Sequence, residues 1–96
     1  MYARVARIER FPEGGIDDAI RLMAEREAGR KDAPGYEGSY FLVDRQNAKG
    51  LVVVLWATEA DLTSHTGVAQ QGEQVARAAG WQSPGWEVYE VGFHSR

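Results

Sequence analysis

The chain has 96 residues, of which 44% are hydrophobic and 26% are charged, a composition typical of one ordinary globular domain. Its formal net charge is -3 and its basic residues do not cluster, so we expect no nucleic-acid partner. Because the chain has no cysteine, disulfides, thiolate metal sites and a cysteine nucleophile are excluded.

The first half of the sequence predicts a strand, a helix and a second strand. Residues 2–9 carry β-branched and aromatic side chains and end at a turn-forming segment, residues 11–15. Apolar residues at helical spacing predict a helix over residues 16–31, whose acidic first turn and basic last turn suit the helix dipole. Residues 36–44 then form the second predicted strand.

The second half predicts a strand, a helix and a final strand. The run LVVVLWA, residues 51–57, follows a six-residue polar connection, which favours a hairpin with the preceding strand. Its apolar side chains on both faces are typical of a central strand. Thr58 and Asp61 resemble a capping box, so we expect a second helix to begin there and to end at Gly80. Residues 86–93 alternate as the last strand.

The element order βαββαβ predicts one domain over residues 1–96 with a ferredoxin-like α+β fold. In this fold a four-stranded antiparallel sheet carries two helices on one face, and the first and third strands lie at its centre. The opposite face keeps exposed apolar side chains, so we expect a homodimer that packs sheet against sheet.

Neither a membrane span nor a signal peptide is expected. The longest apolar run, residues 51–57, is far too short to cross a bilayer, and the N-terminal segment MYARVARIER lacks an apolar signal region. We therefore expect a cytoplasmic protein that does not bind membranes.

Three stretches carry a resemblance to a known family: PGYEGSYFLVDR, LVVVLWATEADLTSH and WEVYEVGF. With a Pro-Gly before the second strand, a Trp at the end of the third and a His on the second helix, the chain resembles the antibiotic biosynthesis monooxygenase domain family. The resemblance covers essentially the whole chain. It implies a dimeric α+β barrel with a cavity in each subunit, and oxidation of a small aromatic or polyketide-like molecule by O2 without a cofactor.

The resemblance places Trp56 and His65 at that cavity. His65 lies on the apolar face of its helix, so it either acts as the general base on a phenol or hydrogen-bonds a backbone carbonyl in the core. Trp56 is either a wall against which a planar ring stacks or a core residue. Tyr40 and Phe41 are further candidates for substrate binding, with core packing as the alternative.

Charged residues on the first strand and the first helix are assigned by the face of the element on which they lie. Arg4 and Arg7 point to opposite faces of the first strand, so at most one of them faces the helices. A buried arginine there would favour an anionic substrate, but we expect pairing with a strand carboxylate such as Glu90. Residues 25–27 are expected to form a solvated helix face. The spacing of the two histidines indicates no metal site, and no motif indicates a bound cofactor.

Some positions depart from well-known members of the family. Val52 stands where quinone-forming members can carry an asparagine, and Thr66-Gly67-Val68-Ala69 stands where many relatives carry bulky residues. The second departure would reshape or enlarge the pocket, and it could break the second helix near Gly67. Haem-degrading members use an asparagine in the first strand and a histidine about two and a half to three turns into the second helix. Both are missing here, so haem degradation is disfavoured. The alternatives are a non-catalytic dimeric protein that binds a small ligand, or lactone isomerisation.

Overall fold

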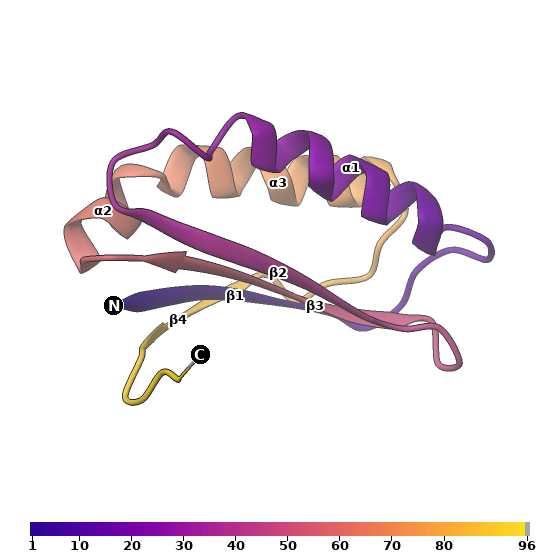
Figure 1. Ribbon diagram of the computed structural model, residues 1–96. Helices are drawn as coiled ribbons and strands as arrows, with labels where there is room; N and C mark the ends of the chain where they lie inside the picture. Colours follow the sequence, from indigo (N-terminus) through magenta and orange to yellow (C-terminus); the bar gives the residue numbers. More distant parts are fainter. Residues whose placement is uncertain (96) are drawn as a thin grey trace.

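The computed structural model describes residues 1–95 and contains one antiparallel sheet with helices over one of its faces (Figure 1). The strands are β1 (Tyr2–Ile8), β2 (Tyr36–Asp44), β3 (Lys49–Trp56) and β4 (Trp86–Glu90). Their order, β2-β3-β1-β4, places β1 and β3 at the centre. This confirms the predicted ferredoxin-like α+β fold.

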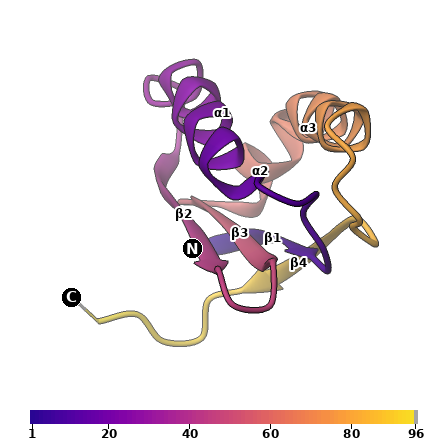
Figure 2. The ribbon, with the colours of Figure 1, turned by 90° about the vertical axis from the view of Figure 1, so that its right-hand side faces the viewer.

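The helices are α1 (Ile16–Ala28), α2 (Glu59–Ser64) and α3 (Thr66–Ala78). Figure 2 shows α1 and α3 next to each other above the same face of the sheet. No helix within residues 1–95 combines the length and the apolar content that a membrane span requires.

The expected second helix is divided into two helices, α2 and α3, and the break lies two residues before Gly67, the position near which it was expected. The break lies at His65, whose φ of -106° and ψ of 17° are not helical. Around the break, the Ser64 hydroxyl donates to the Ala60 carbonyl at 2.9 Å and the Thr66 hydroxyl donates to the Thr63 carbonyl at 2.8 Å. Such side-chain bonds to the backbone compete with the helical hydrogen bonds and bend or end a helix.

The start of α2 is fixed by the predicted cap. The hydroxyl oxygen of Thr58 accepts a hydrogen bond from the Asp61 backbone N–H at 3.1 Å and donates to the Asp61 carboxylate at 2.8 Å. Gly35, in the loop before β2, packs directly against that carboxylate. Its φ of +78° favours glycine, and a β-carbon at this position would overlap Asp61. The cap therefore also holds α2 against the loop that leads into β2.

The core lies between the sheet and the helices. The register pairs Ala6 with Val52, and both side chains are buried on the face that the helices cover. Three aromatic residues form a cluster with ring centroids 5.3 to 6.3 Å apart. They are Phe11, which follows β1, Phe41 of β2, and Trp81, which follows α3. Phe11 is only 2% exposed, so this cluster closes one end of the core.

Replacing Phe11 with alanine should destabilise the fold. Loss of a buried phenylalanine costs about 3–5 kcal/mol, because the contacts with Phe41 and Trp81 are lost and a cavity remains. Urea unfolding would measure this, with Phe93→Ala as the control, since Phe93 is 86% exposed and its change should stay within about 0.5 kcal/mol. Equal stability of the two variants would contradict the position of the core.

Candidate functional site

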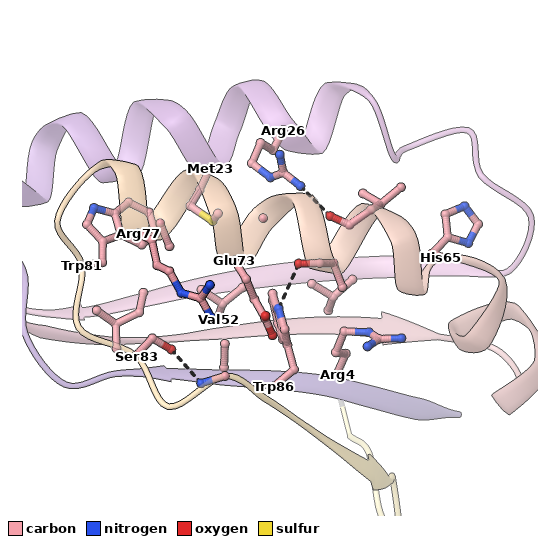
Figure 3. A pocket seen from close by; sticks show the side chains of 18 of the residues that line it. Arg4, Met23, Arg26, Val52, His65, Glu73, Arg77, Trp81, Ser83 and Trp86 are labelled. Atoms are coloured by element: carbon pink, nitrogen blue, oxygen red, sulfur yellow. Dashed lines mark hydrogen bonds between the residues drawn. The ribbon is translucent and has the colours of Figure 1, made fainter.

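A cavity of about 310 Å³ lies between the sheet and the helices α1 and α3 (Figure 3). β1 and β3 form its floor, α1 and α3 form its walls, and the segment from Trp81 to Trp86 closes one end. The lining residues are Arg4, Ala6, Ile8, Met23, Arg26, Arg30, Val52, Val54, Trp56, His65, Val68, Ala69, Gly72, Glu73, Ala76, Arg77, Trp81, Ser83, Pro84, Gly85 and Trp86.

The structure brings Trp56 and His65 together in the lining of this cavity. Their rings are stacked, with centroids 4.4 Å apart and an angle of 22° between the planes. Trp56 also makes an edge contact with Tyr36, at a centroid distance of 5.5 Å. Trp56 is 2% exposed, and its indole nitrogen Nε1 is buried without a hydrogen-bond partner. It is thus both a core residue and part of the cavity wall.

The hydrogen bond of His65 fixes its tautomer. Nδ1 lies 3.1 Å from the Asp61 carbonyl oxygen, one turn earlier in the chain. Because a carbonyl oxygen only accepts hydrogen bonds, Nδ1 is the donor, and the neutral ring carries its lone pair on Nε2. The two alternatives considered for His65 are therefore compatible: it bonds a backbone carbonyl through one nitrogen, and its ring lines the cavity.

Phe41 and Tyr40 lie elsewhere. Phe41 is on the sheet face that the helices cover, but its ring packs against Phe11 and, nearly parallel, against Trp81. It therefore stands behind Trp81, which lines the cavity, and is not itself in the lining. Tyr40 is 59% exposed and pairs with Val53 on the opposite face of the sheet, away from the cavity. The structure does not bring Tyr40 to the site.

Arg4 is the arginine of β1 that faces the helices, and its expected pairing with a strand carboxylate is wrong. Its side chain is 8% exposed, and Nη2 donates to the Leu62 carbonyl at 3.1 Å and to the Thr66 hydroxyl at 3.2 Å. These acceptors lie on either side of His65, at the end of α2 and the start of α3. Arg4 therefore ties the central strand to the break between the two helices.

Arg26 also lines the cavity, so the prediction that residues 25–27 are a solvated face is wrong for this residue. Its Nη2 donates to the Val68 carbonyl at 3.0 Å, which connects α1 to α3. A β-carbon on Gly72 would lie 3.2 Å from the same nitrogen. Glycine at position 72 thus leaves the room that the Arg26 guanidinium occupies against α3.

Four arginines and one glutamate line the cavity: Arg4, Arg26, Arg30, Arg77 and Glu73. With His65 neutral, four positive charges and one negative give the lining a formal charge of +3, whereas the whole chain carries -3. Within residues 1–95 none of these arginines forms an ion pair, because the three ion pairs of the structure involve other residues. The lining of the cavity is thus net positive in a chain that is net negative.

Burial affects two of these guanidinium groups directly. It lowers the pKa of Arg4 from the ordinary arginine value, and the negative charge of Glu73 opposes this effect. Burial likewise lowers the pKa of Arg26, and the nearby positive charge of Arg30 lowers it further. Both groups still carry their charge at neutral pH, since an arginine pKa lies far above it. Both directions indicate that the cations are incompletely solvated.

Helical spacing contains a signal that would have found two of these arginines. The apolar face of α1 runs through Ala19 and Met23, and continuing it by three and seven residues from Met23 leads to Arg26 and Arg30. Among residues 1–95 no group of three or more His, Cys, Asp or Glu side chains is arranged to hold a metal ion.

Comparisons with known proteins show the fold. No protein-family model matches the chain, and no curated protein matches it in sequence. Among solved structures, it is similar to the haem degrader MhuD from Mycobacterium tuberculosis, a structure with two haems bound in the active site. The two chains match over 100% of each, with a TM-score of 0.66 and 17% sequence identity. The chain therefore shares the α+β fold of MhuD.

Proposed function

We propose that this protein belongs to the antibiotic biosynthesis monooxygenase family and oxidises a small aromatic or polyketide-like phenol with O2, without a cofactor. The observation that carries the proposal is the state of His65 in the cavity. Nδ1 is occupied by the Asp61 carbonyl, which leaves the lone pair of Nε2 available to accept a proton. Stacking on Trp56 holds the ring in place.

The reaction needs only a base and a site that excludes bulk water. In the enol tautomer of an anthrone-type substrate, one hydrogen of the CH2 group has moved to the oxygen, and His65 removes this phenolic proton; the resulting anion passes one electron to O2. The superoxide and the substrate radical combine to a peroxide at the ring carbon that keeps one hydrogen. The O–O bond then breaks, one oxygen stays as the quinone carbonyl, and the other leaves as water with that hydrogen and the proton that His65 returns. Four electrons leave the carbon and reduce one O2.

The other candidate residues take different roles in this proposal. The buried indole N–H of Trp56 has no partner, and we assign it as a donor to a substrate oxygen. Phe41 acts indirectly, by supporting Trp81 at the far end of the cavity. Tyr40 is assigned to the subunit interface described below.

Oxygen consumption with a panel of hydroxyanthrones and hydroquinones tests the oxygenase proposal. At least one compound should raise uptake above the buffer rate, and His65→Ala should slow that reaction by about 10²–10⁴-fold, the usual contribution of a general base. His94→Ala is the matched control, because His94 lies beyond β4 and does not line the cavity. The proposal fails if no compound raises uptake, or if both histidine variants behave alike.

A second candidate, haem degradation, is favoured by the likeness to MhuD. Against it stands the position of the histidines. α3 contains no histidine, and His65 lies before its first residue, at the break between the helices. A protein of this fold that only binds a small ligand is the third possibility, and it requires the cavity but not the base.

Titration with haem separates the second candidate from the first. Because α3 contains no histidine and His65 lies at the break before it, we expect no saturable change in the Soret band that His65→Ala abolishes. A stoichiometric Soret shift that disappears in His65→Ala would instead assign the protein to haem chemistry.

We further propose that the protein is a homodimer that packs sheet against sheet. Tyr40 and Leu42 are 59% and 50% exposed on the face opposite the helices, and Tyr89 of β4 is 51% exposed on the same face. Figure 2 shows no helix over this face. A second copy of the chain would present the same apolar side chains, which suits a two-fold interface.

Sedimentation velocity tests the dimer. The unmodified chain should sediment as a dimer at micromolar concentration, and Leu42→Glu should shift it towards the monomer by placing a charge in the interface. Ile20→Glu is the control, because Ile20 is 38% exposed on α1, on the other side of the sheet. A monomeric unmodified chain, or equal dissociation of both variants, would contradict the interface.

A further inference from the structure

The three arginines at the α1 and β1 side of the cavity have more hydrogen-bond donors than partners. A guanidinium carries five N–H donors. Arg4 uses Nη2 for two acceptors, and Arg26 uses Nη2 for one. Arg30 is only 9% exposed, and its Nε is buried without a hydrogen-bond partner. A buried donor left without an acceptor is costly, so Nε of Arg30 favours an acceptor supplied by a ligand, and the free donors of Arg4 and Arg26 can contribute to the same site.

The same three groups also lack a counter-ion. Within residues 1–95, none of them forms an ion pair with a carboxylate. Glu73 is the acidic residue of the lining, and it influences Arg4 without reaching ion-pair distance. Enclosing several like charges without a partner is unfavourable, and an anion held between them removes that cost.

Helix α3 is shaped around one of these charges. A glycine inside a helix costs roughly 0.5–1 kcal/mol relative to alanine. Gly72 lies within α3, with no positive φ to explain it, and it faces the Arg26 guanidinium. The glycine allows Arg26 to lie between α1 and α3 at the cavity wall. Its presence is explained by placement of the cation and not by the backbone conformation of the helix.

Beyond these three arginines the lining contains Arg77, Glu73 and Ser83, and its other residues are mostly apolar or aromatic. The apolar and aromatic part suits a flat ring. Met23 of α1 and Val52 of β3 lie between the arginines and Trp81, which faces the cavity from its far end (Figure 3). Trp86 also lines the cavity, and its indole N–H is already used by the Ala69 carbonyl at 3.2 Å. The cavity therefore combines three arginines at one end with apolar and aromatic side chains, among which Arg77 and Glu73 also lie.

We propose that the ligand of this cavity is a planar aromatic carboxylic acid, with its carboxylate bound by Arg4, Arg26 and Arg30 and its ring lying towards Trp81. Guanidinium groups bind carboxylates through two parallel N–H bonds, so several arginines define an orientation as well as a charge. The proposal names the substrate class of the oxygenase proposed above and rests on that function for its catalytic meaning. The binding itself requires no oxidation.

Isothermal titration calorimetry with two probes of matched shape tests the inference. 2-Naphthoate carries the carboxylate, 2-naphthamide replaces it with a neutral group, and neither contains the phenol that the oxidation requires. The full chain should bind the naphthoate at least about tenfold more tightly, because charge-assisted hydrogen bonds are about twice as strong as neutral ones. This preference should weaken as salt is added.

Variants assign the preference to the cavity. Arg26→Gln should weaken naphthoate binding at least about fivefold and naphthamide binding to a clearly smaller extent, and Arg26→Lys should fall between Arg26→Gln and the unmodified chain. Arg21→Gln is the matched control, because Arg21 lies on the same helix, is exposed and pairs with Asp18. Far-UV circular dichroism and urea midpoints confirm that the variants are folded. Arg30→Gln provides a second variant of the anion site should Arg26→Gln not fold.

Three results would overturn the inference: equal affinity for the two probes, equal effects of Arg26→Gln and Arg21→Gln, or no binding of either probe at millimolar concentration. The outcome is separate from that of the oxygenase proposal. Charge-selective binding without oxygen uptake supports the acid-binding cavity and refutes the catalysis. Oxygen uptake with neutral phenols, together with no preference for naphthoate, supports the catalysis and refutes the acid-binding cavity.

Discussion

Arg4, Arg26 and Arg30 carry positive charge into the space between the sheet and the helices, where water is limited and no carboxylate within residues 1–95 pairs with them. Such charges are tolerated when their donors reach oxygen acceptors. Arg4 finds them at the ends of α2 and α3, and Arg26 finds one on α3. These bonds connect β1 and α1 to the helical segment that carries His65. The placement of the cations and the position of the histidine are therefore one structural feature.

The break between α2 and α3 has a related consequence. A continuous helix would keep the His65 ring at a fixed rotation around the helix axis. The break instead lets Nδ1 bond the Asp61 carbonyl while the ring lies against Trp56. The Thr58 cap and the contact between Gly35 and Asp61 fix the start of α2, so Asp61 is itself well positioned. A chain of local contacts thus sets the orientation of a side chain that the proposed reaction uses as a base.

The fold followed from the sequence because its signals were strong and local. The turn before β2, the doubly apolar run of β3 and the capping box defined the elements, and β1 and β3 took the central positions that their order predicts. The break was expected near Gly67 but lies at His65, because it depends on competition between hydroxyl groups and helical carbonyls, which helical periodicity does not describe. Element type is a property of many residues, whereas a helix break is a property of a few.

The candidate site was only half predictable. Trp56 and His65 were placed in the cavity region correctly, since a strand end and a helix face define direction. The sequence did not predict which face of the sheet Arg4 occupies. Apart from the two arginines, both faces of β1 carry mainly small or apolar residues, and strand alternation shows only that Arg4 and Arg7 lie on opposite faces. Arg26 was assigned to solvent because charged side chains usually are. A buried arginine on β1 favours an anionic substrate from the sequence alone, but only the structure shows that Arg4, Arg26 and Arg30 line the same cavity.

The most direct test of the cationic cavity is nuclear magnetic resonance of the arginine side chains during titration with 2-naphthoate. Each Nε–H group reports its own environment, and Nε of Arg30 has no partner before the ligand is added. Large shifts of the Arg4, Arg26 and Arg30 signals, with unchanged signals from Arg21 and Arg45 on the surface, are the predicted result. Shifts confined to surface arginines, or none at all, would contradict the account.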